Sequence, residues 1–322
     1  MSGKLFIIPV FLPWMGCTNR CIYCNEIAVT GYNHLNFEDK HILEKLNQEV
    51  DESLKYASAD KKRQIAFFGG SFSNTNVDIQ KKFLDWAYAY IKNGTVDSIR
   101  LSTRPDGITD EIVRLYKRYQ VESIELGVQS FFDDVLKKNN RGHDAQSCKE
   151  AVRLLKTAGI ETGVHLMLGL YGSDREKDRE SFDIACSIHP DTLRIHPTLV
   201  LKDTALERLW HRGDYEPLDL RTSVEEMGRM YNKAEGAGIK MNRIGLFIPA
   251  ELEDSVVAGP YNQSIGDMTK IMAFVYKILE KVQDGVQIEL TKEEYNRIKS
   301  HKGFFMEYLE PYITQNLIIL DS

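Results

Sequence analysis

Short apolar runs alternate with helix-patterned segments along most of this chain, and this alternation predicts repeated strand–helix units around a parallel sheet. The predicted strands are Leu5–Val10, Gln64–Phe68, Ser98–Ser102, Ser123–Leu126, Thr162–Leu168, Thr192–Pro197 and Lys240–Gly245. Apolar positions three and four residues apart predict helices over residues 38–57, 76–92, 109–119, 144–158, 174–188 and 221–238. The pattern favours an α/β fold, a partial (β/α)6 TIM-like barrel of parallel strands, with the chemistry at the carboxyl ends of the strands.

The alternation ends near residue 266. The remaining chain predicts a helix, a short strand, a second helix and a final strand, at Asp267–Val282, Val286–Leu290, from Thr291, and at Asn316–Leu320. Glu294, three residues after Thr291, completes a capping-box pattern for the second helix. We therefore expect a barrel domain over residues 1–266 and a small C-terminal α+β appendage over residues 267–322.

Composition narrows the class of protein. Of the 322 residues, 43% are hydrophobic and 27% are charged, which is typical of globular proteins and excludes disordered and collagen-like chains. The net charge of −6 argues against broad capture of nucleic acid by a basic surface. No apolar run reaches the roughly 20 residues that a membrane helix needs, and the start shows no signal-peptide cleavage pattern. We expect a cytoplasmic protein with no membrane partner.

The five cysteines are an odd number, which favours metal or catalytic use over a disulfide framework. Cys17, Cys21 and Cys24 follow the first predicted strand with C-x3-C-x2-C spacing. Cys148 and Cys186 stand alone in predicted helices, where we expect them to pack as small apolar side chains. Three thiols in one loop predict a metal site at the end of the first strand.

Two kinds of metal site are compatible with three thiols. A structural zinc ion takes four protein ligands, and the nearest histidine, His34, lies ten residues after Cys24 with no motif around it. An iron–sulfur cube has four irons, so three cysteines leave one iron open. The open iron can chelate the amine and the carboxylate of an amino-acid group, which S-adenosylmethionine provides.

The C-x3-C-x-aromatic-C pattern of Cys17, Cys21, Tyr23 and Cys24 resembles the radical S-adenosylmethionine (radical SAM) superfamily. The resemblance implies that the three cysteines hold a single 4Fe-4S cluster and that S-adenosylmethionine binds beside it. Reductive cleavage of this cofactor to a 5′-deoxyadenosyl radical is the implied chemistry. An electron donor such as flavodoxin or ferredoxin is an implied partner, and the exposed cluster makes the protein oxygen-sensitive.

A pair of glycines follows the second predicted strand in Phe67-Phe-Gly-Gly-Ser-Phe72. Glycines at a strand end let the backbone approach a ligand closely, although a plain tight turn is the alternative. In the superfamily this turn receives the amino group of S-adenosylmethionine. The resemblance therefore assigns Gly69, Gly70 and Ser71 to cofactor binding.

Polar side chains follow the third and fourth predicted strands. Ser102 and Arg104 lie in Ser102-Thr-Arg-Pro-Asp106, Gln129 ends the fourth strand, and Arg141 precedes a glycine and a histidine. Hydroxyl, amide and guanidinium groups can bind the ribose or the carboxylate of a ligand. The resemblance implies that Ser102, Gln129 and Arg141 contact the cofactor. We expect Arg104 to contact the substrate, a surface ion pair being the alternative.

The last strands carry further candidates. His165 alternates with apolar neighbours, so its side chain faces either the barrel interior or the packing against helices. We assign His165 to the cofactor, and the resemblance implies that the adenine ring lies over Leu168 and the glycine after it. Arg194, His196 and Arg243 lie near the ends of the last two strands, where they are candidate substrate contacts.

Over residues 5–266 these motifs resemble the branch that contains the Elongator catalytic subunit, which modifies the wobble uridine of transfer RNA. Ser102, Gln129, Arg141 and His165 also align in order with cofactor-contacting positions of oxygen-independent coproporphyrinogen dehydrogenases, which usually carry aspartate in place of His165. Elongator subunits have a C-terminal acetyltransferase-like domain. Residues 267–322 are too few to form one, so the carboxymethyl reaction is not expected to carry over.

The expected function is therefore that of a radical SAM enzyme with one cluster, because the remaining cysteines lie far apart in the sequence. The resemblance favours a transfer RNA nucleoside as substrate. The net charge, and the five Lys and Arg against eight Asp and Glu in the first 60 residues, favour a small molecule. The alternative from another class is a non-catalytic iron–sulfur or cofactor carrier, or a chaperone.

Overall fold

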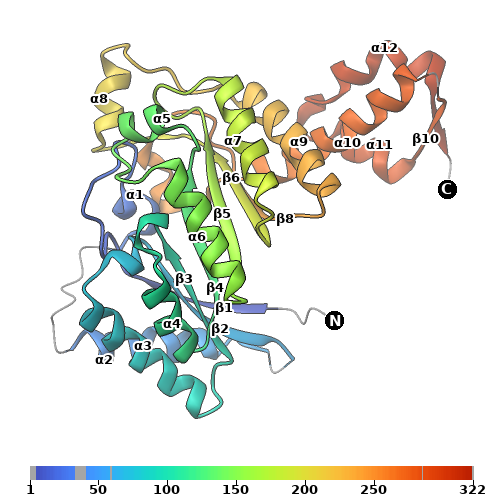
Figure 1. Ribbon diagram of the computed structural model, residues 1–322. Coiled ribbons are helices and arrows are strands. Elements are labelled where there is room, and N and C mark those ends of the chain that lie inside the picture. Colours follow the sequence, from blue (N-terminus) through green and yellow to red (C-terminus); the bar gives the residue numbers. More distant parts are fainter. Residues whose placement is uncertain (1–4, 33–40, 59, 285, 321–322) are drawn as a thin grey trace.

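The computed structural model describes residues 5–32, 41–58, 60–284 and 286–320, the last eight of them as backbone only. Seven parallel strands form one sheet in the order β1-β2-β3-β4-β5-β6-β8, with β1 and β8 as its edges. Their bounds are Leu5–Phe11 (β1), Lys62–Phe68 (β2), Ser98–Thr103 (β3), Val121–Gln129 (β4), Glu161–Leu168 (β5), Thr192–Pro197 (β6) and Lys240–Ile244 (β8). The sheet curls into a half-barrel (Figure 1), which confirms the predicted strands and fold class.

Helices follow the strands, and all of them except the short α1 cover the outer face of the sheet (Figure 1). Their bounds are Glu26–Thr30 (α1), Ile42–Leu54 (α2), Val77–Lys92 (α3), Asp110–Arg118 (α4), Ala145–Thr157 (α6), Arg175–Ser187 (α7) and Leu220–Gly236 (α9). The side chains of Thr109, Asp144, Asp174 and Asp219 cap four of these helices by accepting a backbone N–H near the start of each. All six predicted helices are confirmed, and the start of the one predicted over residues 38–57 lies outside the described residues.

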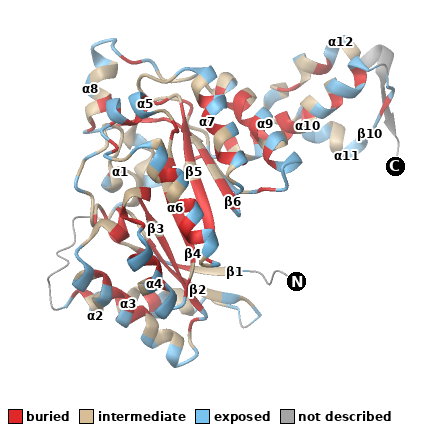
Figure 2. Ribbon diagram, viewed as in Figure 1, coloured by how far each residue is buried: buried red, intermediate tan, exposed pale blue. Residues whose placement is uncertain are grey.

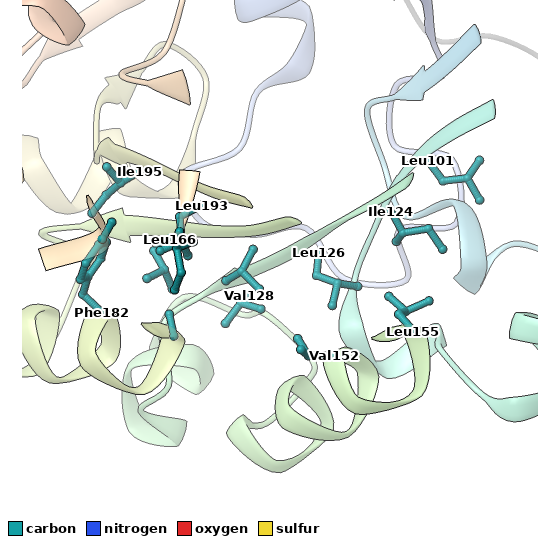
Figure 3. Close-up of a cluster of buried hydrophobic side chains, with 14 of the residues drawn as sticks. Leu101, Ile124, Leu126, Val128, Val152, Leu155, Leu166, Phe182, Leu193 and Ile195 are labelled. Carbon is teal, nitrogen blue, oxygen red and sulfur yellow. The ribbon is translucent and has the colours of Figure 1, made fainter. Parts of the chain in front are cut away.

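The main core lies between the sheet and the helices (Figure 2). Figure 3 shows side chains of β3 to β6, including Leu126 and Leu166, directed at Val152 of α6 and Phe182 of α7. Cys148 and Cys186 are buried in the same core, which confirms their predicted packing role. Because side chains alternate along a strand, the residues between these apolar ones face the concave side of the sheet.

Several short elements were not predicted. They are α1, α5 (Asp133–Lys138), α8 (Ala205–His211), β7 (Val200–Leu201), β9 (Val256–Ala258) and the 3₁₀ turns η1 (Phe72–Asn74), η2 (Pro105–Gly107), η3 (Ala250–Ser255) and η4 (His301–Gly303). β7 and β9 pair with each other in antiparallel fashion, outside the main sheet. Leu201 pairs with Val256, which lies 55 residues further along the chain, so no local sequence pattern predicts this pairing.

The C-terminal part forms an arm beside the half-barrel (Figure 1). It comprises α10 (Ile265–Gln283), β10 (Ile288–Thr291), α11 (Lys292–Lys299), α12 (Met306–Asn316) and β11 (Leu317–Leu320). α10 packs along α9, and β10 pairs with β11 in parallel. The capping box of Thr291 and Glu294 is confirmed, whereas α12 was not predicted and the domain boundary at residue 266 stays a prediction. Within the described residues, the helices are all too short or too polar to cross a bilayer.

Candidate functional site

The three-cysteine loop leaves the carboxyl end of β1 and runs into α1. Two tight turns shape it, because the Cys17 N–H donates to the Trp14 carbonyl (3.0 Å) and the Cys24 N–H to the Cys21 carbonyl (3.1 Å). Gly16, with φ of +69°, lies so close to the carbonyl oxygen of Ser71 that any Cβ there would overlap it. Cys17, Cys21 and Cys24 are free thiols and partly exposed, so one loop presents all three as available ligands.

The surroundings of Cys17 and Cys24 resist the ionisation of these two thiols. Burial, followed by the neighbouring charges of Glu26 and Cys21, raises the pKa of Cys17 to about 12. Burial also raises the pKa of Cys24 well above its ordinary value. One cation offsets this, since Arg141 Nη1 donates to Cys21 Sγ at 3.1 Å. Thiolates in this loop therefore need a further positive partner, which bound iron would provide.

The geometry around these thiols is not that of a single-ion site. Among the residues that the structure describes, no three His, Cys, Asp or Glu side chains converge on one metal ion. In an iron–sulfur cube each iron takes its own thiolate, so the ligands are spread around the cluster. Three thiols on one loop are the donor set that such a cube requires.

The Gly-Gly turn after β2 packs directly against the cysteine loop. Gly69 and Gly70 have φ of +79° and +70°, and a Cβ on Gly70 would lie 2.5 Å from the backbone nitrogen of Met15. The Ser71 side chain is fully buried, and its hydroxyl donates to Asn74 Oδ1 (2.6 Å). The turn therefore lies where it was predicted, but the Ser71 hydroxyl supports the turn and offers a ligand no exposed group.

Glu26 is a site residue that was not predicted. Its two carboxylate oxygens accept the N–H groups of Gly70 and Trp14, each at 2.7 Å. Burial raises its pKa, although these two backbone donors act against that shift. The only signal in the sequence is its position two residues after Cys24. Glu26 thus ties the cysteine loop to the Gly-Gly turn and places a carboxylate at their junction.

Buried polar atoms without hydrogen-bond partners gather around Gly127, beside the cysteine loop. They are Gln129 Oε1, Arg141 Nε and His143 Nδ1, and the buried Tyr23 hydroxyl lies beside the Cys21 thiol. Arg141 Nη2 donates to the Gly127 carbonyl, and a Cβ on Gly127 would lie 3.2 Å from both Arg141 Nη2 and Gln129 Nε2. Since buried polar groups in proteins nearly always have partners, this gathering fits a polar ligand that the protein binds here.

The other predicted cofactor contacts, Ser102, Leu168 and His165, differ in whether their side chains can reach a ligand. Ser102 is partly exposed and lies in register with Glu125 of β4, on the concave face. Leu168 turns its side chain into the main core, and its carbonyl accepts the N–H and the hydroxyl of Thr198 (2.8 and 2.7 Å). His165 faces the barrel interior, where its Nε2 lies 2.9 Å from Glu125 Oε2. Leu168 can therefore meet a ligand only through the backbone around it.

A buried ionic network occupies the concave face. Glu125, whose side chain is fully buried, accepts Arg100 Nη1 at 2.7 Å and also accepts Arg194 Nη2. Burial acts to raise the pKa of Glu125, but His165 and the two guanidinium groups hold it at about 2. Burial lowers the pKa of His165 and lowers that of His196 to about 4. At neutral pH the network therefore holds one carboxylate, two guanidinium groups and two uncharged imidazoles.

The four predicted substrate contacts do not lie together. Arg104 is buried and forms a two-pronged ion pair with Asp106, through Nε (2.9 Å) and Nη2 (2.6 Å). The ion pair weighed for Arg104 is therefore present, although it is buried and not at the surface. Arg194, His196 and Arg243 do lie close to one another on β6 and β8.

Comparison with known proteins places this arrangement in a family. The sequence profile of the radical SAM superfamily matches residues 12–185, and that of the radical SAM C-terminal domain matches residues 190–277. The chain belongs to the radical SAM superfamily. Membership implies S-adenosylmethionine and a 4Fe-4S cluster, and the three thiols and the unpartnered polar groups beside them fit both.

Individual radical SAM proteins are similar over most of the chain. The tRNA uridine(34) acetyltransferase of Methanocaldococcus jannaschii is 26% identical over 72% of this chain and 45% of its own length. Yeast Elongator complex protein 3 also matches, which confirms the resemblance to the Elongator branch. The chain spans about half the length of the curated relatives that it matches.

Two solved radical SAM structures share the fold. Methanocaldococcus infernus Elp3 with an N-terminal deletion has a TM-score of 0.66 at 22% identity, covering 88% of this chain and 64% of that one. The Escherichia coli coproporphyrinogen III oxidase HemN has a TM-score of 0.52 at 14% identity, covering 74% and 54%. These likenesses establish the half-barrel and leave the substrate open.

Proposed function

We propose that this protein is a radical SAM enzyme that binds one 4Fe-4S cluster through Cys17, Cys21 and Cys24 and acts on a substrate inside the half-barrel. The observation that carries the proposal is the set of unpartnered buried polar groups directly beside three available thiols. When bound, the cluster and S-adenosylmethionine would supply a 5′-deoxyadenosyl radical, chemistry that proteins leave to cofactors.

The chain's own residues bind and orient the cofactor. The Glu26 carboxylate would receive its ammonium group at the Gly-Gly turn, because opposite charges attract strongly at a site so largely withdrawn from water. Arg141 and Gln129 present a guanidinium and an amide to its polar groups, and Tyr23 adds a hydroxyl. Holding the reactive carbon close to the substrate and away from water is the main demand of radical chemistry.

Two substrate classes follow from different observations. The name of the M. jannaschii relative supports a transfer RNA nucleoside, and the net charge of −6 supports a small molecule. Titration with bulk transfer RNA at increasing salt separates them, because phosphate contacts release counterions and weaken as salt rises. Salt-sensitive binding supports the nucleoside, and binding that is absent or independent of salt refutes it.

The first test of the enzyme is anaerobic. The protein is reconstituted with iron and sulfide, reduced with dithionite, mixed with S-adenosylmethionine and assayed for 5′-deoxyadenosine. Cys21→Ala should abolish both the product and most of the bound iron. Cys148→Ala is the matched control, because Cys148 is buried in the core of α6 and should leave iron content and product unchanged.

Two outcomes contradict the proposal. Equal product from the native protein and Cys21→Ala would exclude this cluster as its source. A fully loaded native protein that forms no 5′-deoxyadenosine, with or without candidate substrates, would favour the carrier function. Covalent change in a substrate is what distinguishes an enzyme from a carrier, and flavodoxin or ferredoxin in place of dithionite tests the proposed electron donor.

A further inference from the structure

A row of basic side chains crosses the concave face of the sheet. In the strand register, His165 of β5 pairs with Arg194 of β6, and Arg194 pairs with Arg243 of β8. Their apolar neighbours, such as Leu166 and Ile195, point the other way into the main core (Figure 3). The three basic side chains therefore face the concave side of the sheet, opposite the helices.

The charges around this row do not balance. Arg100 contacts two carboxylates, those of Glu125 (2.7 Å) and Glu161 (3.4 Å), and Arg194 contacts only that of Glu125. Arg243 forms no hydrogen bond or ion pair with any part of the chain that the structure describes, and its side chain is exposed on the edge strand. Three guanidinium groups thus face two carboxylates, and the unbalanced positive charge lies at Arg243.

Two uncharged imidazole side chains, those of His165 and His196, lie in or beside this row. Burial lowers the pKa of both His165 and His196, and the charge of Arg243 adds to that lowering, so both imidazoles are neutral at pH 7. His196 Nδ1 is buried without a partner among the described residues. Arg194 directs its Nε at Asn242 Oδ1 (3.2 Å) and Nη2 at Glu125, which leaves Nη1 for another acceptor. The concave face therefore offers one net positive charge here, together with polar groups of Arg194 and His196 that are free for a ligand.

We infer that Arg243, with Arg194 and His196, binds an oxyanion of the substrate, a carboxylate or a phosphate group. The inference rests on the proposed function, since it places this group in the barrel of a radical SAM enzyme. A guanidinium group binds either oxyanion through two parallel hydrogen bonds. The substrate is accordingly an anion whose charged end lies against β6 and β8.

The test measures anion binding to the anaerobic, cluster-loaded protein. Inorganic phosphate and sodium acetate are titrated separately by calorimetry at low ionic strength, because salt screens such contacts. Arg243→Gln should weaken the better-bound anion about tenfold, the value of one charge-assisted contact. Arg243→Lys keeps the charge but loses the two parallel hydrogen bonds of a guanidinium group, so its affinity for the anion should lie between those of the native protein and Arg243→Gln. The preferred anion identifies the group as a phosphate or a carboxylate.

Two further variants locate the bound anion. Arg153 is a surface residue paired with Glu150 on α6, so Arg153→Gln should leave anion binding unchanged. Arg141→Gln removes a guanidinium group at the cysteine loop and shows whether the anion binds at the cofactor site instead. Loss of binding in Arg141→Gln but not in Arg243→Gln would overturn the inference, as would a native protein that binds neither anion.

The same preparations separate this inference from the proposed function. If the native protein forms 5′-deoxyadenosine but Arg243→Gln binds the anion as well as the native protein does, only the anion site is wrong. If no 5′-deoxyadenosine forms while anion binding depends on Arg243, the radical function is wrong and the anion site stands. Thermal unfolding midpoints are compared to exclude misfolding. Because Arg243 is exposed at the sheet edge, we expect the midpoints of the native protein and Arg243→Gln to agree within a few degrees.

Discussion

Replacing Glu125 by Gln tests whether the buried network holds the half-barrel together. The substitution keeps the shape of the side chain but leaves the guanidinium groups of Arg100 and Arg194 facing an amide. A carboxyl group whose pKa falls from 4.5 to about 2 on folding contributes about 3 kcal/mol to stability at pH 7. Removing one member of a buried ion pair typically costs about 3–5 kcal/mol, so we expect a loss of about 3 kcal/mol or more.

The pH dependence of this loss has a definite sign. Because the folded pKa of Glu125 lies below the unfolded value, its contribution is complete above about pH 5 and is lost as the pH falls toward 2. Between pH 7 and pH 4 the stability gap between the native protein and Glu125→Gln should narrow by about 1 kcal/mol. A gap that widens on acidification would contradict the assignment of a charged Glu125.

Urea unfolding of the anaerobic protein at pH 7, 5 and 4 measures both quantities. Glu150→Gln is the matched control, since Glu150 pairs with Arg153 on the exposed side of α6 and its loss should not shift the urea midpoint measurably. A loss below about 1 kcal/mol for Glu125→Gln at pH 7 would refute the reasoning, because so small an effect is typical of an exposed pair.

Two further predictions concern the cysteine loop. Gly70→Ala should lower both bound iron and the unfolding midpoint, because its Cβ would lie 2.5 Å from the Met15 nitrogen just before the first thiol. Gly94→Ala is its control, since Gly94 has a similar φ of +75° and open space around it, so it should cost only about 1–2 kcal/mol of backbone strain and no iron. Glu26→Gln should weaken S-adenosylmethionine about tenfold in equilibrium binding while iron content stays constant, and unchanged affinity would remove Glu26 from the cofactor site.

The strands and most helices could be predicted from the sequence because each carries its own signal. A run such as Ser123-Ile-Glu-Leu-Gly shows alternating apolar and polar positions, which predict a strand with one packed face. The same alternation also fits a sheet whose polar face meets water. Because the sheet curls into a half-barrel, its polar face lines the interior and is buried. The sequence does not show this curling, so Arg100 and Glu125 were missed although their strands were predicted.

The candidate site divides in a similar way. The three cysteines and the Gly-Gly turn could be found because their chemistry is contained in a few consecutive residues. Glu26 could not be found in this way, because its role depends on accepting a hydrogen bond from Gly70, which lies 44 residues further along the chain. The cofactor contacts of Ser71 and Leu168 stay predictions, and their buried side chains leave only the backbone of these segments to meet a ligand.

The contacts that hold the cysteine loop extend beyond residues 12–185 into the part of the chain that matches the radical SAM C-terminal domain. The Asn25 side chain donates to the Lys202 carbonyl (2.8 Å), and the Ser255 hydroxyl donates to the Ala28 carbonyl (2.8 Å). Both contacts fix α1, which begins two residues after Cys24, to the β7–β9 region and to η3. Glu26, in the same helix, accepts a hydrogen bond from the Gly70 N–H of the Gly-Gly turn. The loop is therefore positioned both by the Gly-Gly turn and by the β7–β9 region, and residues after 185 contribute directly to the geometry of the three-cysteine loop.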